Sequence, residues 1–408
     1  MAVKTTVIIP TYWARESTVG WMEGDAVYDH PTALDREGTI GRVIESMKVL
    51  NNRDFQLVVI ACPTADDIAL LVEKKVEKIV HDSASKVGVD AEVFGPSKLA
   101  EVHRLLNKAG AGEYTDLLKL KGYSTVRNLC LYTAHLLGSD VAVLIDDDEV
   151  FEDPDFMSKA VEFIGKKIDG EYAHGVAGYY LQPSGGYKVE KKLSEWMKQW
   201  GQIPSMNEAF ESLIPNPPRL KKTPLVFGGN MVIHRQLFTK VPFDPNVRRG
   251  EDIDYLINAR MYGYTFYLDR ELSIKHLAPP KSHPDWMQLR EDIYRFTYER
   301  SKLRSQRPAP GMTLLQAEDF DPYPGRFLGD ELEDRVEAAC VLLSEEYRRN
   351  RDQAGWSESL KNLEITTDPA FPGFNPFEAV ISLQKRWKSL MTLTETDAWR
   401  TGIFNQLR

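Results

Sequence analysis

Three consecutive aspartates, Asp146, Asp147 and Asp148, follow an apolar run at residues 141–145. Carboxylates at the end of a buried strand cannot all be ionised without a counter-charge, because burial and mutual repulsion both disfavour the charged forms. Hard oxygen ligands of this kind suit Mg²⁺ or Mn²⁺, usually together with substrate phosphates. The triplet therefore predicts a site for a divalent cation and a phosphorylated ligand. The structural alternative is a solvated loop that caps a helix beginning near Asp155.

A second acidic group, Glu251, Asp252 and Asp254, follows Gly250. A carboxylate in a cavity can take the proton from a reacting hydroxyl group, which is general base catalysis. Acidic residues in a first helical turn are also stabilised by the helix dipole, so capping of a helix over residues 253–262 is the structural alternative. Both roles stay open from the residues alone.

The elements that must position these groups are visible as short apolar runs. Runs rich in β-branched residues predict buried strands at residues 6–9, 57–61, 90–94, 141–145, 176–180 and 264–268. Apolar residues at three- and four-residue steps predict helices at residues 40–50, 69–80 and 125–137. Strands alternating with helices predict an α/β protein with a mostly parallel sheet and helices on both faces. Ligands of such sheets bind beyond the carboxyl ends of the strands, where Pro10, Thr11, Tyr12 and the aspartates lie.

Two further regions have a different character. Residues 13–38 contain charges, glycines and two tryptophans, and they are too long and polar for a minimal turn, so we expect a loop that covers the site. After about residue 280, helical patterns alternate with proline-rich breaks. Two amphipathic helices are predicted there, at residues 331–347 and 377–393. We therefore predict two domains, 1–280 and a mostly helical C-terminal region over 281–408 that serves the acceptor site, dimerisation or contact with a membrane surface.

Segments in consecutive order resemble those of family 2-type glycosyltransferases over roughly residues 5–280. The three aspartates are one of them. The others run from Val7 to Tyr12, from Gly122 to Asn128, from Phe227 to Asn230, over Phe243-Asp244 with Glu251-Asp252, and from Ile274 to His276. Each segment is weak alone, but their order and spacing together are specific.

The resemblance implies a Rossmann-like GT-A fold, that of the nucleotide-diphospho-sugar transferases, with a helical C-terminal extension. It implies a hexosyltransferase that moves one sugar from a nucleotide-sugar donor to a hydroxyl acceptor, with inversion, and that uses Mn²⁺ or Mg²⁺. Asp252 resembles the catalytic base, with Glu251 beside it. Asp148, Asp146 and His276 resemble the metal shell. The residues implied in donor binding are Pro10, Thr11, Tyr12, Gly122, Arg127, Asp146, Asp147, Gly228, Gly229 and Asn230.

Departures from the family pattern limit these expectations. The family usually has an acidic pair after its second strand that holds the base, but this chain has Cys62, Pro63 and Thr64 there. Recognition of uracil is therefore not implied. The Q-x-x-R-W motif and membrane helices of processive synthases are absent from the sequence, which favours a single transfer to a small-molecule, glycan or lipid-linked acceptor.

The composition sets the class of protein. Of 408 residues, 42% are hydrophobic and 27% charged, which is typical of a globular protein. A formal net charge of -9 argues against nucleic acid as a partner. Three widely spaced cysteines fit neither a disulfide framework nor a metal knuckle. We expect a cytoplasmic protein, in contact with a membrane only at its surface, that forms homo-oligomers, if any, through its C-terminal helices.

Other functions stay open. A retaining GT-A transferase with a glycerate-type acceptor would share the fold and the Asp-x-Asp pattern. A haloacid-dehalogenase-like phosphatase would use Asp146 as its nucleophile, followed by Asp148 and Val150, although that motif belongs on a first strand. A nucleotidyltransferase lacks its glycine-rich opening here. A non-catalytic nucleotide-sugar-binding scaffold would bind a donor without turnover.

Overall fold

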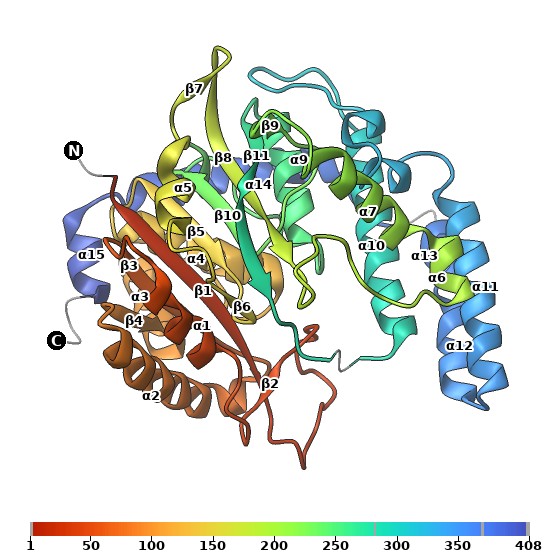
Figure 1. The fold of residues 1–408 in the computed structure, drawn as a ribbon, viewed down its shortest axis with the longest axis horizontal. Helices are drawn as coiled ribbons and strands as arrows, with labels where there is room; N and C mark the ends of the chain where they lie inside the picture. The colour runs from red at the N-terminus through yellow and green to blue at the C-terminus, as the bar shows by residue number, and fades with distance from the viewer. Residues whose placement is uncertain (1–2, 281–282, 369–370, 405–408) are drawn as a thin grey trace.

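The computed structural model describes residues 3–280, 283–368 and 371–404 (Figure 1). Strands and helices alternate through the first two-thirds of the chain, and helices dominate the remainder. The strands are β1 Thr5–Ala14, β2 Thr32–Ala33, β3 Gln56–Pro63, β4 Ala91–Phe94, β5 Val141–Ile145, β6 Glu149–Val150, β7 Lys167–Ile168, β8 Glu171–Leu181, β9 Leu220–Lys222, β10 Asn230–His234 and β11 Thr265–His276. The predicted α/β architecture is confirmed.

The helices fall into two sets, before and after residue 280. Those before it are α1 Ile40–Ser46, α2 Ala69–Val87, α3 Pro96–Lys108, α4 Tyr123–Leu136, α5 Phe156–Glu162, α6 Glu195–Trp200, α7 Gln202–Leu213, α8 Arg235–Phe238 and α9 Glu251–Met261. Those after it are α10 Asp285–Arg304, α11 Leu332–Arg349, α12 Gln353–Lys361, α13 Leu363–Thr367, α14 Pro376–Leu393 and α15 Asp397–Phe404.

The sheet is mixed, with strand order β4-β3-β1-β5-β10-β8-β11-β6. Strands β4, β3, β1 and β5 are parallel, whereas β10 runs antiparallel to both β5 and β8. Since β1, β3 and β5 point the same way, their carboxyl ends meet at one edge. The segments predicted to carry chemistry follow these ends.

Strand β1 is longer than the four residues predicted, because pairing with β3 continues from Thr6 to Trp13. Pairing with β5 stops at Ile8. Pro10, Thr11 and Tyr12 therefore belong to the strand itself, which corrects the expectation that they lie beyond its carboxyl end. Proline cannot donate to a ladder, and it is tolerated here because one side of β1 is unpaired between Ile8, where pairing with β5 ends, and Trp13, where pairing with β2 begins.

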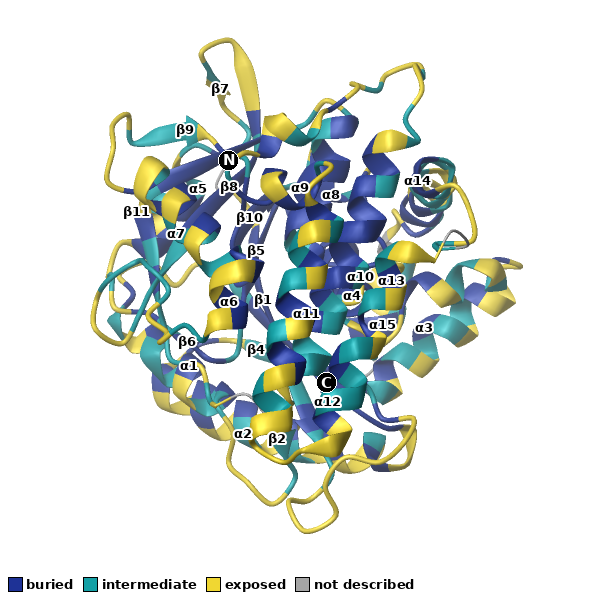
Figure 2. Cartoon of the chain, turned by 90° about the vertical axis from the view of Figure 1, so that its right-hand side faces the viewer, coloured by how far each residue is buried: buried dark blue, intermediate teal, exposed yellow. Residues whose placement is uncertain are grey.

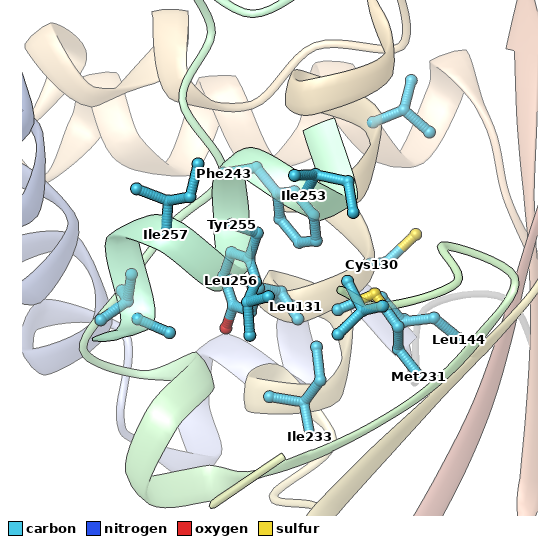
Figure 3. Packing of buried hydrophobic residues seen from close by; sticks show 14 of the residues in the cluster. Cys130, Leu131, Leu144, Met231, Ile233, Phe243, Ile253, Tyr255, Leu256 and Ile257 are labelled. Carbon is cyan, nitrogen blue, oxygen red and sulfur yellow. The ribbon is translucent and has the colours of Figure 1, made fainter. Parts of the chain in front are cut away.

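Two apolar layers cover the two faces of the sheet. Alternate residues of a strand point to opposite faces, so Val7 and Ile9 contact the layer made with α1, α2 and α5, while Ile8 joins the layer made with α4 and α9. Figure 3 shows part of this second layer, in which Leu144 and Met231 of the sheet lie near Ile253 of α9. Burial on both faces explains why the strands are apolar runs without alternation.

The helices after residue 280 extend this second layer. Phe296 of α10 and Trp387 and Leu390 of α14 are fully buried in the same cluster as the α4 and α9 side chains. In Figure 2 their inward faces are dark blue and their outward faces yellow or teal. The division into two domains stays a prediction, but the core is continuous across residue 280. None of the described helices is long and apolar enough to cross a bilayer.

Candidate active site

A cavity of about 500 Å³ lies beyond the carboxyl ends of β1 and β5. Residues from many separate segments of the sequence line it, from Pro10 to Tyr323, so the fold brings together side chains that are far apart in the chain. Most of the predicted site residues line this one cavity, namely Pro10, Tyr12, Arg127, Asp146, Asp147, Asp148, Gly228, Glu251, Asp252 and His276.

The three aspartates form the turn between β5 and β6, and each has a different partner. Asp146 Oδ1 accepts a hydrogen bond from Arg127 Nη2 at 2.6 Å. Asp147 Oδ2 accepts one from Thr11 Oγ1 at 2.5 Å. Asp148 Oδ2 lies 3.3 Å from His276 Nε2. The three carboxylates therefore contact three different partners, and these contacts reduce the repulsion expected between adjacent carboxylates.

These environments shift the protonation of the aspartates differently. Burial, reinforced by the charge of Asp148, raises the pKa of Asp147 to about 8. Burial acts in the same direction on Asp148, but the hydrogen bond and charge of His276 outweigh it and leave the pKa of Asp148 below its ordinary value. The Asp148 side chain is thus an anion in the cavity at neutral pH.

His276 reaches Asp148 because of backbone pairing. Strand β6 pairs antiparallel with the end of β11, with His276 opposite Glu149, and the backbone N–H of Leu277 donates to the carbonyl of Asp148 at 2.9 Å. The imidazole also stacks on Tyr180, with ring centres 4.9 Å apart. A residue 128 positions downstream of the aspartate is therefore fixed beside it by sheet register.

Glu149, which the sequence analysis did not single out, follows the three aspartates directly and supports their turn. Its side chain is fully buried, and Oε2 accepts a hydrogen bond from the backbone N–H of Asp146 at 3.0 Å. Burial and the nearby aspartates raise its pKa well above the ordinary value, which favours the neutral form of the group. Its place directly after the aspartates was the only sequence signal available.

Arg127 connects the acidic turn to the second acidic group. Its side chain is 4% exposed, and Nε donates to Glu251 Oε1 at 3.3 Å while Nη2 binds Asp146. The remaining nitrogen, Nη1, is buried and has no hydrogen-bond partner among the described residues. A buried cationic donor without a hydrogen-bond partner is destabilising, so this atom could donate to a further anionic partner.

Glu251 and Asp252 are the first two residues of α9, as the capping alternative also required. Burial raises the pKa of Glu251 to about 7, against the opposing charge of Arg127. Burial raises the pKa of Asp252 as well. Asp252 Oδ2 accepts a hydrogen bond from the backbone N–H of Gly228 at 3.0 Å, which fixes the carboxylate in the lining of the cavity.

Glycine is required at two positions because a side chain would not fit there. A side chain at Gly229 would place Cβ 2.3 Å from Glu149 Oε1 and 2.6 Å from Asp146 Oδ2. Gly250 precedes α9 with φ of +71°, and a Cβ there would overlap the guanidinium of Arg295. The chain thus passes so close to the acidic turn and to Arg295 that only hydrogen fits.

The other predicted donor-binding residues are placed differently. The Asn230 side chain is buried in the sheet, and its Nδ2 donates to the carbonyls of Tyr179 and Leu272 at 3.3 and 3.1 Å. Gly229 donates its N–H to the hydroxyl of Tyr180 at 2.7 Å. Neither Asn230 nor Gly229 is among the residues that line the cavity.

The loop predicted over residues 13–38 lies against the site. Tyr28 is buried on Tyr12, with ring centres 4.2 Å apart, and its hydroxyl accepts from the N–H of Gly122 at 2.8 Å. Arg15 holds the loop through ion pairs with Asp25 and Asp67. The loop therefore covers the ends of β1 and β3, as expected, while its motion stays a prediction.

A second cavity, of about 700 Å³, is lined by residues 26–29 of this loop and by Gly122. The two cavities share a wall made of Asp29, Tyr123, Arg249 and Gln288. Within it, Arg249 Nη2 lies 3.2 Å from Asp29 Oδ2. An ion pair thus separates the two spaces.

The donor set suits a cation that arrives with its substrate. Among the described residues, no three His, Cys, Asp or Glu side chains are gathered into a cage that could hold a metal ion by themselves. The cavity instead offers one close pair, Asp148 and His276. Magnesium and manganese commonly take one or two protein ligands and complete their shell with phosphate oxygens and water. The residues present therefore fit a phosphate-bridging ion.

Comparison with known proteins adds the following. No protein-family model matches the sequence, and no curated protein matches it. Among solved structures, the chain is similar to a mannosyltransferase from Pyrobaculum calidifontis in complex with GDP-Man and Mn²⁺, at 13% identity over 96% of this chain and 86% of that one, with a TM-score of 0.45. It is also similar to GalNAc-T7 with UDP, GalNAc and Mn²⁺, at 12% identity over 92% and 58% of the two chains, with a TM-score of 0.40.

A third similar structure is a mycobacterial protein, at 16% identity over 73% and 74% of the two chains, with a TM-score of 0.39. The mannosyltransferase and GalNAc-T7 are GT-A-type glycosyltransferases. Identities this low do not show a shared substrate.

Proposed function

We propose that this chain is a metal-dependent glycosyltransferase that moves one sugar from a nucleoside-diphosphate donor to a hydroxyl acceptor, with inversion at the anomeric carbon. One observation carries the proposal. A single cavity is lined by the close pair Asp148 and His276, by Arg127, whose Nη1 has no hydrogen-bond partner among the described residues, and by Asp252, whose carboxylate accepts the Gly228 N–H. A transfer in which a phosphate is the leaving group needs a site for a cation, a positively charged donor and a base close together.

Asp148 and His276 would hold the metal. Asp146, which accepts a hydrogen bond from Arg127, would lie beside them. When bound, a divalent ion neutralises the negative charge that grows on the departing diphosphate. Arg127 Nη1 would donate to a diphosphate oxygen, which gives this buried nitrogen the partner that the protein does not supply.

Asp252 would take the proton from the acceptor hydroxyl. The acceptor oxygen forms its bond to the anomeric carbon while the bond from that carbon to the phosphate oxygen breaks, and the electron pair leaves with the diphosphate. The proton ends on the Asp252 carboxylate, which the Gly228 N–H keeps in place. A raised pKa makes this carboxylate a stronger base than a solvated aspartate.

The test begins with donor binding. UDP, GDP, CDP, ADP and dTDP are each added with Mn²⁺ and with EDTA, and the melting temperature is measured, since a ligand of the native state raises it. We expect one nucleotide to stabilise the protein only with metal. The corresponding sugar nucleotides then report nucleoside diphosphate release, and NMR of the first-formed product anomer reports inversion. No metal-dependent response to any nucleotide would contradict the proposal, and a retained configuration would remove Asp252 as a simple base.

A further inference from the structure

The acceptor side of the cavity is walled by α6, α7 and residues 225–227. From this wall we infer that the acceptor is an alcohol whose body is largely apolar, such as an aryl or alkyl group, and not a sugar or a small polyol. The inference rests on the proposed function, because it concerns what the same cavity accepts beside Asp252.

The wall is built from apolar side chains. From Gln182 to Phe227, a stretch that the structure describes completely, the residues lining the cavity include no Asp, Glu, Asn, Ser, Thr or His. Apolar and aromatic groups make up most of it, among them Trp196, Met197, Ile203, Met206, Phe210 and Phe227. Pockets that bind sugars need polar partners for the ring hydroxyls, since a hydroxyl that leaves water without a new hydrogen bond is destabilising.

Several of the polar groups near this wall already have partners. Gln202 Oε1 accepts from Trp200 Nε1 at 3.2 Å, and Gln202 Nε2 lies 3.4 Å from the Tyr323 hydroxyl. The Tyr180 hydroxyl accepts the N–H of Gly229. Lys191 is exposed at the rim. An acceptor with many hydroxyls would find few groups here to replace water.

One polar group of the wall is different. Trp196 Nε1 is buried and has no hydrogen-bond partner among the described residues, although its ring lines the cavity. An indole N–H only donates, so it suits one oxygen on an otherwise apolar molecule. The acceptor thus carries an apolar body with an oxygen that can accept this bond.

The wall leads to the proposed base. Phe227 lies between Phe210 and Tyr180, with ring centres 4.9 and 5.0 Å away, and the next residue, Gly228, donates its N–H to Asp252. An apolar body packed on Phe227 therefore has its hydroxyl within the reach of the Asp252 carboxylate. Phe227, which would contact the acceptor, and Gly228, which orients the proposed base, are consecutive residues.

The experiment compares alcohols of opposite character. Release of nucleoside diphosphate from the sugar nucleotide chosen by the melting panel is measured with 2-phenylethanol, 1-hexanol, glycerol, D-glycerate and methyl α-D-glucopyranoside at equal concentration. We expect the first two to raise release over the rate with water at least about 10-fold more than the other three. A preference for glycerol, glycerate or the glucoside, or no preference at all, overturns the inference.

Two methionine variants separate packing from other effects. Met206→Gln places an amide in the apolar wall, whereas Met312→Gln changes a methionine that is also partly buried but lies outside the cavity. We expect Met206→Gln to remove most of the preference for 2-phenylethanol and Met312→Gln to keep it. Equal preference in both variants counts against the wall as the acceptor site.

The two proposals fail in different ways. If no sugar nucleotide is bound with metal, the glycosyltransferase function itself fails. If a nucleotide binds with Mn²⁺ and its sugar is transferred to water or to a polar alcohol, the function stands and only the apolar acceptor is wrong. The melting panel and the alcohol panel therefore answer separate questions.

Discussion

Arg127 Nε donates to Glu251 Oε1 across 3.3 Å, and this bond joins two residues 124 positions apart in the chain. The same guanidinium binds Asp146, so the acidic turn after β5 and the first turn of α9 share one cation. The two halves of the proposed chemistry, leaving-group stabilisation and proton removal, are therefore held at a fixed separation. Preorganisation of this kind lowers the cost of reaching a reactive geometry.

Gly229→Ala should disrupt the site. The substitution removes no titratable group, but the new methyl would lie 2.3 Å from Glu149 Oε1 and force the acidic turn to move. We expect a loss of transfer activity of about 10²-fold or more, since small displacements of reacting groups have effects of this size. Gly329→Ala is the control, because a Cβ at Gly329 meets nothing within 4 Å. Equal activity in both variants would show that the turn tolerates the methyl.

Asp148→Ala should abolish metal-dependent nucleotide binding, and His276→Ala should weaken it, because these two side chains form the proposed cation pair. Calorimetric titration of the nucleotide in Mn²⁺ and in EDTA measures both effects. Asp54→Ala, at an exposed position away from the cavity, should bind as the parent does. Unchanged affinity of Asp148→Ala in Mn²⁺ would remove that residue from the metal site.

Asp252→Asn keeps an oxygen that can accept the Gly228 N–H but loses the basic carboxylate. We expect donor affinity close to that of the parent and a fall in kcat of about 10²-fold or more. In the parent, activity should decline as the pH falls through the raised pKa of Asp252, because the protonated group cannot accept a proton. Turnover near the parental value would exclude Asp252 as the base.

Lys302→Met should destabilise the fold. Lys302 of α10 is completely buried, forms an ion pair with Asp254 of α9, and lies 3.3 Å from Asp244 and 3.0 Å from Asn258 Oδ1. Removing one partner of a buried pair leaves an uncompensated charge, so we expect a loss of about 3–5 kcal/mol in the free energy of unfolding.

Denaturant unfolding measures this loss against two further variants. Lys78→Met removes an exposed lysine paired with Asp82 and should change the free energy of unfolding far less than Lys302→Met, because solvent screens this pair. Asp254→Asn combined with Lys302→Met should recover part of the loss, because the buried carboxylate is neutralised. A small effect of Lys302→Met alone would show that the network does not anchor α9.

Glu299→Gln should stabilise the protein at alkaline pH. The Glu299 carboxyl is fully buried, neither oxygen has a hydrogen-bond partner among the described residues, and burial raises its pKa to about 8. Because the folded pKa exceeds the ordinary value of about 4.5, its contribution to stability is fully present below that pH and is lost as the pH rises toward 8.

The melting temperature of Glu299→Gln relative to the parent should therefore rise between pH 5 and pH 9. Glu318→Gln, at an exposed position, should follow the parent at every pH. Parallel curves for the parent and Glu299→Gln would mean that Glu299 is ionised in both the folded and the unfolded state.

Much of the fold was visible in the sequence, because its strands are buried on both faces and read as apolar runs. Residues 141–145 match β5 at both ends, and the helix predicted at 377–393 begins one residue earlier, at Pro376. Strand ends were less predictable. The continuation of β1 past Pro10 depends on pairing with β3, which no local pattern reports.

The site was predictable where a motif carries it and not where tertiary contacts do. The order of the acidic turn, the Glu251-Asp252 pair and His276 along the sequence predicted a common site, and all of them line one cavity. Lys302 was not expected as a core residue, since lysine is rarely fully buried without partners, and its partners Asp244 and Asp254 lie 58 and 48 residues away. The place of α6 in the cavity wall likewise depends on its packing against α11 and on the contact of Trp200 with Phe296 of α10, for which the sequence has no motif.

The wall between the two cavities has a consequence for inhibitor design. Asp29 and Arg249 form an ion pair there, between spaces of about 500 and about 700 Å³. A nucleotide-like compound with a charged arm that replaces one partner of this pair would extend from the active site into the second space. Its selectivity would come from this partition, which the loop over residues 13–38 and the segment before α9 build together, and not from contacts with the proposed metal site.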